Sequence, residues 1–415
     1  MSQPQVALDA RGEPAGRWRA LTVLACATFL AMSTWFSASA VLPQLRVEWQ
    51  LTPTAGAWLT IAVQLGFVAG SLLSAVFNLP DLVSPRRLML CGAAGAALAN
   101  LCLAWCSGAA QAIPLRAATG AALALVYPPS LKEMATWFRA GRGTALGVMV
   151  GALTLGSALP HLLNGLGGVE WRTVIYLTSA LTLLGGAIAE WGERDGPFPF
   201  PKARFDPRQI ALGLRNRRVR LVSLGYFGHM WELYAMWTWF GVFLAARFAS
   251  EGTFSDPRRA AAFATFAAIG SGALGCVFGG ILGDRWGRAR TNALAMAVSG
   301  ACALLAGWSG WPAWALVVIG VIWGFWVVAD SAQFSAMATE YADQSYVGTA
   351  VTVQLALGFT LTVVTIWLLP WLFDVAGTHA AFASLAAGPA AGIIAMLRLT
   401  SRRSIARGAA GNVVT

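Results

Sequence analysis

The sequence is poor in charged residues. Asp, Glu, Lys and Arg make up only 11% of its 415 residues, whereas soluble globular proteins carry about 25%. So few charged side chains cannot cover the surface of a soluble chain of this length. The shortage excludes a cytosolic enzyme and a disordered protein. Together with a hydrophobic content of 57%, it indicates an all-α protein that crosses a membrane several times.

Cysteine and histidine are also scarce, with six and three residues. All six cysteines fall in expected membrane spans, and Cys102 and Cys106 have no histidine or carboxylate beside them that would complete a metal site. The chain has no nucleophile–base set, phosphate-binding glycine loop or His-Glu-x-x-His helix. We therefore expect no enzyme activity, no metal and no cofactor.

Apolar stretches, by contrast, follow one another along almost the whole chain. A membrane-spanning helix needs roughly 20 apolar residues. We expect twelve such helices, at residues 20–43, 54–77, 87–107, 111–131, 144–166, 173–191, 220–246, 260–283, 292–309, 312–338, 347–371 and 379–399.

The distribution of basic residues predicts the orientation in the membrane. A net charge of +11 suggests nucleic-acid binding at first sight. With both termini in the cytoplasm, however, 23 of the 29 basic residues lie in cytoplasmic segments and five in periplasmic loops, as the positive-inside rule requires. The segment Met1–Trp18 has no cleavable apolar core of a signal peptide. We expect a multi-pass inner-membrane protein in contact with lipid and not with nucleic acid.

An internal repeat divides the chain into two halves. Shifting the sequence by 203 to 205 residues aligns 32–36 with 236–240, 134–136 with 337–339, and 143–145 with 348–350. An even number of spans in each half makes the two halves parallel. The expected organisation is a cytoplasmic tail, a six-helix bundle, a basic and proline-rich linker, a second six-helix bundle and a cytoplasmic tail, at residues 1–18, 19–191, 192–219, 220–399 and 400–415.

Two motifs in this chain are similar to those of a known family. Residues 280–290 read GILGDRWGRAR, which resembles the Gly-x-x-x-Asp-x-x-Gly-Arg-[Arg/Lys] loop of the major facilitator superfamily, with Ala289 in the last position. Arg116-x-x-x-Gly120 resembles the second motif of that family. The resemblance covers about residues 18–400. It implies two parallel six-helix bundles, alternating access and a functional monomer.

The loop motif predicts a conformational gate on the cytoplasmic side. Its glycines allow helices to approach closely, its aspartate can accept hydrogen bonds at a helix N-terminus, and its arginines can bind carboxylates or lipid phosphates. A plain basic membrane anchor is the alternative. The repeat partner at residues 78–87 keeps the acidic and basic residues but lacks the glycines. The expected gate residues are Asp81, Arg86, Gly280, Asp284, Gly287 and Arg288.

Three ionisable residues of the second half are candidates for proton coupling, because a charge inside the membrane is costly and is kept mainly for function. His229 and Glu232 are three residues apart and share a helix face. Histidine is the side chain type that titrates nearest to physiological pH, so the two could form a proton relay or a static pair. Asp330 could act as a cavity residue or fix two helices together.

Other polar and aromatic residues predict where a solute binds. Arg116, the one basic residue within a span, can bind a carboxylate or an oxyanion with two hydrogen bonds, as the resemblance also implies. The alternative is a structural arginine paired with helix carbonyls. The expected substrate-binding residues are Arg116, Trp35, Gln64, Tyr234, Trp239 and Gln354, with helix packing as the alternative for the aromatic residues.

Two transport functions fit these patterns. The first is proton-coupled transport of a small anionic solute, and some features are similar to the nitrate/nitrite and cyanate porters. The alternative is proton-driven efflux of amphipathic or cationic compounds, which acidic and aromatic residues would suit. A sensor that transports nothing would need an appended signalling domain, and the sequence contains none.

Overall fold

The computed structural model describes residues 14–167, 170–192, 194–198, 206–308, 310–343 and 346–400. Within this part of the chain, the regular secondary structure is almost entirely helical. The first half contains α1 (Arg17–Ala31), η1 (Met32–Thr34), α2 (Ser37–Ala40), α3 (Leu42–Glu48), α4 (Pro53–Val76), α5 (Leu79–Leu82), α6 (Pro85–Leu101), η2 (Cys102–Trp105), α7 (Ala109–Leu123), α8 (Tyr127–Ala135), α9 (Arg142–Gly167) and α10 (Trp171–Trp191).

The second half begins after two short helices of the linker, η3 (Pro207–Gln209) and α11 (Ile210–Arg215). Residues 199–205 of the expected linker lie outside the described residues. The helices of the second half are α12 (Arg217–Glu251), α13 (Pro257–Trp286), α14 (Arg288–Ala306), α15 (Ala313–Val327), α16 (Ser331–Tyr341), α17 (Val347–Leu385) and α18 (Ala387–Thr400).

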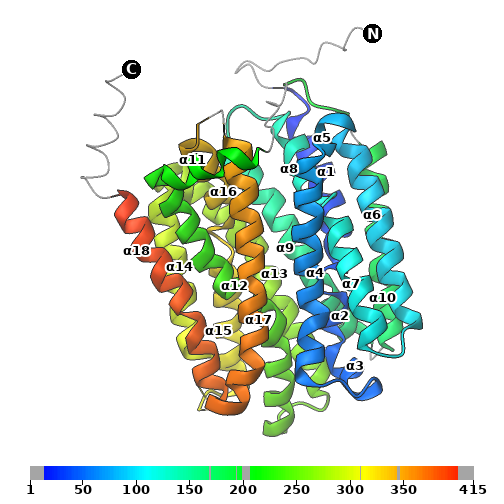
Figure 1. The fold of residues 1–415 in the computed structure, drawn as a ribbon. Coiled ribbons are helices and arrows are strands. Elements are labelled where there is room, and N and C mark those ends of the chain that lie inside the picture. Colours follow the sequence, from blue (N-terminus) through cyan, green and yellow to red (C-terminus); the bar gives the residue numbers. More distant parts are fainter. Residues whose placement is uncertain are drawn as a thin grey trace.

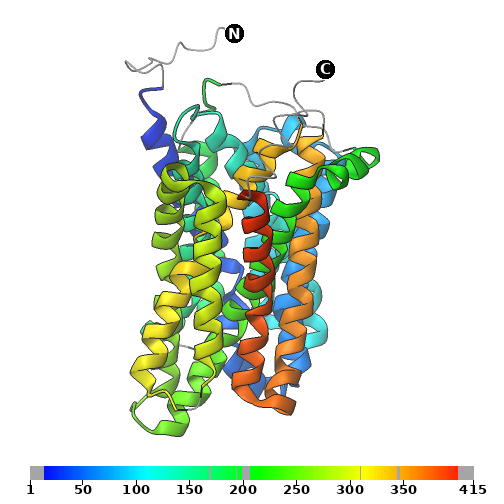
Figure 2. The same ribbon diagram turned by 90° about the vertical axis from the view of Figure 1, so that its left-hand side faces the viewer.

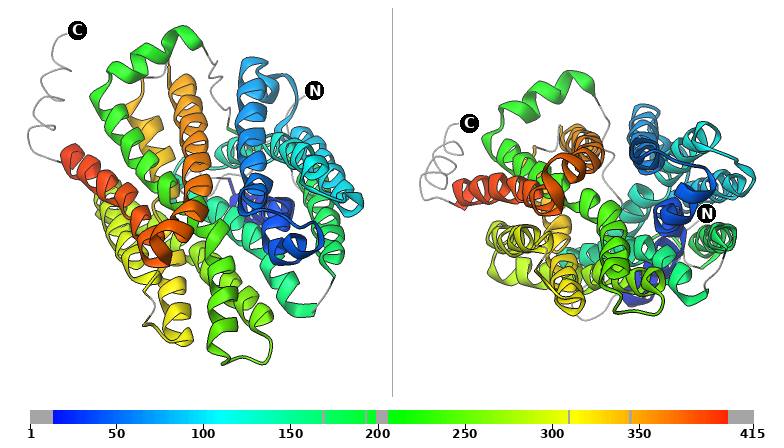
Figure 3. Two further views of the ribbon diagram at one scale, coloured as in Figure 1. Left: turned by 60° about the horizontal axis from the view of Figure 1, so that its bottom comes forward. Right: turned by 90° about the horizontal axis from the view of Figure 1, so that it is seen from below.

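The helices form two bundles side by side, α1–α10 and α12–α18 (Figures 1 and 3). The start of α1 and the end of α18 lie at the same end of the molecule, which we call the terminal end (Figures 1 and 2). The opposite end, where α3 lies, is called the far end. Helix α11 lies across the terminal end of the second bundle (Figure 1).

Nine helical stretches among the described residues are long and apolar enough to cross a membrane. The longest, Val347–Thr400, contains Gly377 with φ 81° and ψ 173°, a conformation that only glycine adopts readily. The chain descends along α17 and returns along α18 (Figure 1). The all-α membrane fold is thus confirmed, whereas the count of twelve helices and the cytoplasmic position of both termini stay predictions.

The internal repeat is visible in the positions where helices are interrupted. Residues 124–126 separate α7 from α8, and residues 328–330 separate α15 from α16, an offset of 204 residues. The first helix of each half differs: α1 is interrupted at Met32–Thr34, while its counterpart α12 is continuous over 35 residues. The two halves therefore share one plan but differ around the first helix.

The two bundles meet closely along α9 and α13. A Cβ atom added to Gly147 would lie 2.6 Å from the carbonyl oxygen of Cys276, and one added to Gly280 would lie 2.9 Å from that of Gly143. Glycine is needed at these positions because the two backbones leave no room for a side chain. We call this contact the α9–α13 seam.

Candidate functional site

Arg116 on α7 is completely buried, and its guanidinium fills the interruption of the first helix. Its Nη1 atom donates to the Thr34 carbonyl oxygen at 3.0 Å, and its Nη2 atom donates to the carbonyl oxygen of Trp35. Its Nε atom donates to the carbonyl oxygen of Leu59 at 3.2 Å, and Nη1 also reaches Asn100 Oδ1 at 3.3 Å. These contacts match the structural alternative that the sequence left open for this arginine.

The second half has no corresponding arginine. The repeat counterpart of Arg116 is Gly320, where an added Cβ would lie 2.4 Å from the ring of Phe240. An aromatic ring thus packs in one half where a guanidinium hydrogen-bonds in the other. This difference explains why the first helix is interrupted and α12 is continuous, because only the first half has donors for the carbonyls that an interruption leaves unpaired.

Aromatic side chains from both halves meet between α1–α2 and α12. Trp35 stacks on Tyr234 with ring centroids 6.0 Å apart, and Phe36 stacks on Tyr234 at 6.2 Å. Phe67 and Phe359 complete the group at 4.7 Å from each other. We call Trp35, Phe36, Phe67, Tyr234 and Phe359 the aromatic barrier, since they fill the space between the bundles. Two expected substrate residues, Trp35 and Tyr234, therefore lie where the halves meet.

The other expected substrate residues are spread over several contacts. Gln64 on α4 is fully buried, and neither atom of its amide group has a hydrogen-bond partner, which in a native core calls for a functional explanation or an ordered water. Gln354 on α17 accepts from the Ser223 hydroxyl at 3.2 Å. Trp239 donates to the carbonyl oxygen of Ile366 at 3.0 Å and so anchors α12 to α17.

Trp239 also links the two halves at the far end. The Arg46 guanidinium on α3 lies 5.7 Å from the centre of its ring, a cation–π distance. Partial burial lowers the pKa of Arg46, and the negative charge of Asp374 opposes this decrease.

His229 on α12 is buried and contacts the interruption between α15 and α16. Its Nδ1 atom lies 2.9 Å from Asp330 Oδ1, and its Nε2 atom lies 2.8 Å from the Ser331 hydroxyl. Asp330 is also buried, so the two ionisable groups face each other away from solvent. The structure thus brings two of the three expected proton-coupling residues into direct contact, and the partner of His229 is Asp330 rather than Glu232.

Glu232 lies one turn further along α12 and faces the interior of the second bundle. Its carboxylate accepts from Trp323 Nε1 at 2.7 Å and from the Ser299 hydroxyl at 2.9 Å. The side chain is 1% exposed and no basic residue pairs with it in the described part of the chain. Two neutral donors on α15 and α14 therefore hold this carboxylate, which the sequence pattern did not predict.

The expected gate motif lies at the terminal end of the α9–α13 seam. A Cβ added to Gly143, in the first turn of α9, would lie 2.4 Å from Asp284 Oδ1, so the Asp284 carboxylate lies against the N-terminus of α9. There the helix dipole favours an anion. Arg288 lies 3.3 Å from Asp284, 2.9 Å from Glu340 and 2.6 Å from Gln333 Oε1.

The remaining gate residues have separate positions. Gly287 has φ 98° and lets the chain turn from α13 into α14. Gly280 allows the close approach to α9 described above. Arg86 donates to the carbonyl oxygen of Glu190 at the end of α10 at 3.0 Å and to Asp195 of the linker at 2.7 Å. Asp81 lies in α5, and its side chain lies outside the described residues.

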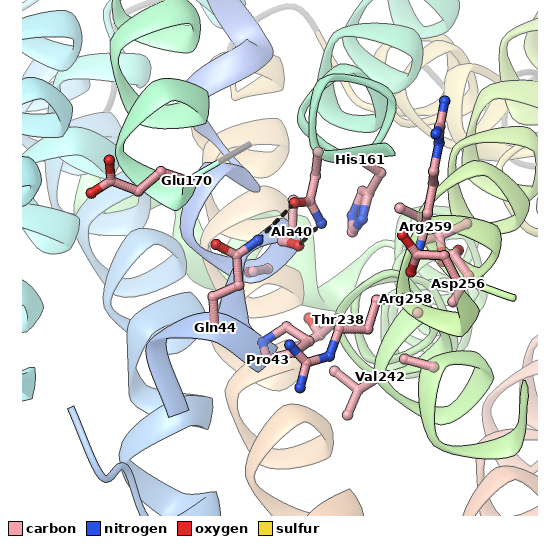
Figure 4. A pocket seen from close by; sticks show the side chains of 17 residues that line it. Ala40, Pro43, Gln44, His161, Glu170, Thr238, Val242, Asp256, Arg258 and Arg259 are labelled. Carbon is pink, nitrogen blue, oxygen red and sulfur yellow. Dashed lines mark hydrogen bonds between the residues drawn. The ribbon is translucent and has the colours of Figure 1, made fainter. Parts of the chain in front are cut away.

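A cavity of about 450 Å³ lies between the halves at the far end (Figure 4). Residues from α2, α3 and α9 line one side, and residues from α12 and the start of α13 line the other. His161 on α9 borders it, although the side chain is only 6% exposed and its Nε2 atom has no hydrogen-bond partner. This cavity was not predicted, because its walls come from distant parts of the sequence.

Two pseudo-repeated helical bundles in a membrane protein, with a cavity between them, are the architecture of a transporter. A family model described as "Major Facilitator Superfamily" matches residues 24–275. The chain belongs to the major facilitator superfamily, whose members are secondary transporters and not enzymes.

A known structure supports this fold over nearly the whole chain. The proton:xylose symporter XylE, solved with a bromo-deoxy-glucose, superposes with a TM-score of 0.72 at 13% identity and covers 93% of this chain and 96% of that one. At that identity the similarity shows the fold alone.

Two curated relatives match part of the chain. The multidrug efflux pump LfrA of Mycolicibacterium smegmatis is 28% identical over 207 residues, which is 48% of this chain and 40% of that protein. The putative uncharacterized transporter YgaY of Escherichia coli is 30% identical over 177 residues, 41% of this chain and 43% of that protein. The chain thus matches about two fifths of the length of each of these relatives.

Proposed function

We propose that the chain is a proton-coupled secondary transporter that moves a small organic anion by alternating access. The observation that carries the proton coupling is the buried contact between His229 and Asp330, 2.9 Å apart. The charge of such a pair depends on a single proton, and burial in the membrane makes an uncompensated charge costly. Gain or loss of that proton therefore changes the stability of the contact between His229 and Asp330.

The position of the pair connects the proton to the helices. Asp330 is the last residue of the interruption between α15 and α16, and His229 lies on α12. When Asp330 is charged, it favours contact with a protonated His229; when it is protonated, this attraction is lost. A proton thereby shifts the packing of α12 against α15 and α16, the kind of two-state element on which coupling depends.

The charges around the cavity support an anionic solute. The donors of Arg116 are occupied by backbone carbonyls, so we assign the attraction of an anion to other residues. Arg258 and Arg259 line the far-end cavity together with Asp256 and Glu170, and the Glu170 carboxylate is paired with Arg172 at 2.6 Å. Arg258 extends toward Pro43 and Thr238 of the lining and supplies the positive group that supports an anion (Figure 4).

Efflux of amphipathic or cationic compounds is the second candidate. The aromatic barrier favours it, because aromatic faces attract cations, as does the similarity to part of a multidrug efflux pump. The relatives do not support a place near the nitrate/nitrite and cyanate porters, and we do not propose those substrates. Twelve crossings, cytoplasmic termini, a functional monomer and the two-bundle boundaries at 19–191 and 220–399 belong to this proposal.

Proteoliposomes with an internal pH indicator would test proton coupling. We expect small carboxylates, added outside under a proton gradient, to be accumulated by the wild-type protein. In Asp330→Asn, gradient-driven accumulation is expected to be lost while solute exchange at equal pH is kept, because the amide preserves the shape but cannot release a proton. The matched control is Glu340→Gln, which removes a carboxylate of the same segment outside the buried pair.

Two results would contradict the proposal. Unchanged gradient-driven accumulation in Asp330→Asn would remove this pair from coupling, and Glu232→Gln would then be the next variant to test. Accumulation of lipophilic cations but not of carboxylates by the wild-type protein would favour the second candidate.

A further inference from the structure

We propose that the far-end cavity is a binding site for the carboxylate of an organic anion, with His161 and Arg258 as the recognising residues. This inference rests on the proposed function and adds where the anion is first held. The two residues come from opposite halves, His161 from α9 and Arg258 from the start of α13. A solute bound by both would therefore contact both bundles before it passes the aromatic barrier.

His161 has an unused capacity for hydrogen bonding. His161 is only 6% exposed, and its buried Nε2 atom has no hydrogen-bond partner. A buried polar group without a partner costs free energy unless a ligand or water satisfies it. At the offset of 205 residues that aligns 143–145 with 348–350, the residue that corresponds to it in the second half is Ile366. The second half thus has no imidazole at the corresponding position.

The wall that carries His161 is held in place by two amide side chains. Asn164, one turn along α9, donates to the carbonyl oxygen of Ala40 at 2.9 Å, and Gln44 donates to Asn164 Oδ1 at 3.1 Å (Figure 4). These bonds tie α9 to the end of α2 and to α3. The position of His161 is thereby fixed before a ligand arrives, which reduces the entropy cost of binding.

Arg258 provides the charge on the opposite wall. Figure 4 shows its side chain extending toward Pro43 and Thr238, whereas Arg259 extends away from them. The carboxylate of Glu170 also points away from the cavity and is paired with Arg172 (Figure 4). Asp256 accepts from the backbone N–H of Arg259 at 3.0 Å and so caps α13. Of the two acidic residues of the lining, Glu170 is therefore paired with Arg172, whereas Asp256 keeps its charge. The Arg258 side chain is exposed at the cavity and can pair with an anion.

The other residues of the cavity define the body of the ligand. Val242, Ala245, Ala261 and Ala262 give it an apolar side. Ligand sites for small organic molecules typically have a volume of about 300–1,000 Å³ and combine apolar walls with a few polar groups. The volume of about 450 Å³ and this lining fit a monocarboxylate with an apolar body better than an inorganic anion.

Binding of benzoate to the purified full-length protein tests this site. Benzyl alcohol and benzylamine have the same ring without the negative charge. By isothermal titration we expect the wild-type protein to bind benzoate at least tenfold more tightly than either. Arg258→Gln, which removes the charge, and His161→Leu, which removes the donor, should each weaken benzoate binding about 10- to 100-fold, the usual effect of losing a hydrogen bond to a charged group. Arg259→Gln, the matched control on the same turn, should change it less than threefold.

The outcomes separate this site from the transport function. Benzoate binding that is tight in the wild-type protein and unchanged in Arg258→Gln and His161→Leu would overturn the site while leaving anion transport in place. No preference of the wild-type protein for benzoate over benzyl alcohol and benzylamine would overturn both the site and the anionic substrate. Equal losses in Arg258→Gln and Arg259→Gln would show a general effect of charge and would also overturn it.

Discussion

The guanidinium of Arg116 is surrounded by backbone carbonyl oxygens and amide or hydroxyl oxygens rather than by a carboxylate. Five hydrogen bonds reach residues of the interrupted first helix, α4 and α6. A guanidinium can hold so many acceptors because its donors are fixed in one plane and its charge is weakly hydrated. Arg116 belongs to a motif that is associated with substrate. Here its side chain instead stabilises the unusual backbone conformation at the interruption of the first helix.

Replacing Arg116 by lysine should test this role. Lysine keeps the charge but cannot reach acceptors on three segments from a single ammonium group, so we expect a loss of stability of about 2–4 kcal/mol. A lower melting temperature in detergent would show it. Arg172→Lys is the control, because Arg172 forms partly exposed ion pairs that typically contribute about 0–1 kcal/mol. Equal melting temperatures of the two variants would contradict the structural role.

At the scale of elements, the sequence predicts long apolar helices much better than their interruptions. Apolar stretches and an offset of about 204 residues are local or repeated patterns, so they could be read directly. The interruption at Met32–Thr34 has no Gly or Pro in its sequence and depends on Arg116, which is far away in the chain. The partners of His229 and Glu232 depend in the same way on the packing of α12 against α14, α15 and α16.

The glycines of the α9–α13 seam give a test at this scale. In Gly147→Ala the new Cβ would lie 2.6 Å from a backbone carbonyl oxygen of α13, so the helices must move apart. We expect a loss of about 1–3 kcal/mol, the usual cost of overpacking, measured as a lower melting temperature. Gly270→Ala is the matched control in the same seam, since its Cβ would lie 3.5 Å from Leu155. A loss of stability as large in Gly270→Ala would show that close packing is not the cause.

At the scale of the whole molecule, the structure is closed by different contacts at its two ends. The Asp284 carboxylate against α9 connects the halves at the terminal end, and Arg46 over Trp239 connects them at the far end. Alternating access requires that one set of contacts opens while the other forms. The sequence motif predicted the first contact, whereas the second has no sequence signature.

Asp284→Asn should slow transport without abolishing solute binding. The amide keeps the shape but loses the charge that the N-terminus of α9 favours, so the closed terminal end becomes less stable. The initial rate of uptake is expected to fall several-fold while the Kd changes less than threefold. Glu340→Gln removes another carboxylate bound to Arg288 and should have a smaller effect on the rate. Loss of solute binding in a correctly inserted Asp284→Asn protein would contradict a purely conformational role.

The α9–α13 seam also contains a cysteine. Cys276 is fully buried there, with its sulfur 3.5 Å from the Val328 carbonyl oxygen and 3.9 Å from the Thr154 hydroxyl. A reagent can reach this thiol only when the two bundles separate. With the other five cysteines replaced, the rate of alkylation at Cys276 would therefore measure how often the α9–α13 seam opens. The native thiol thus serves as a probe of this step of the transport cycle.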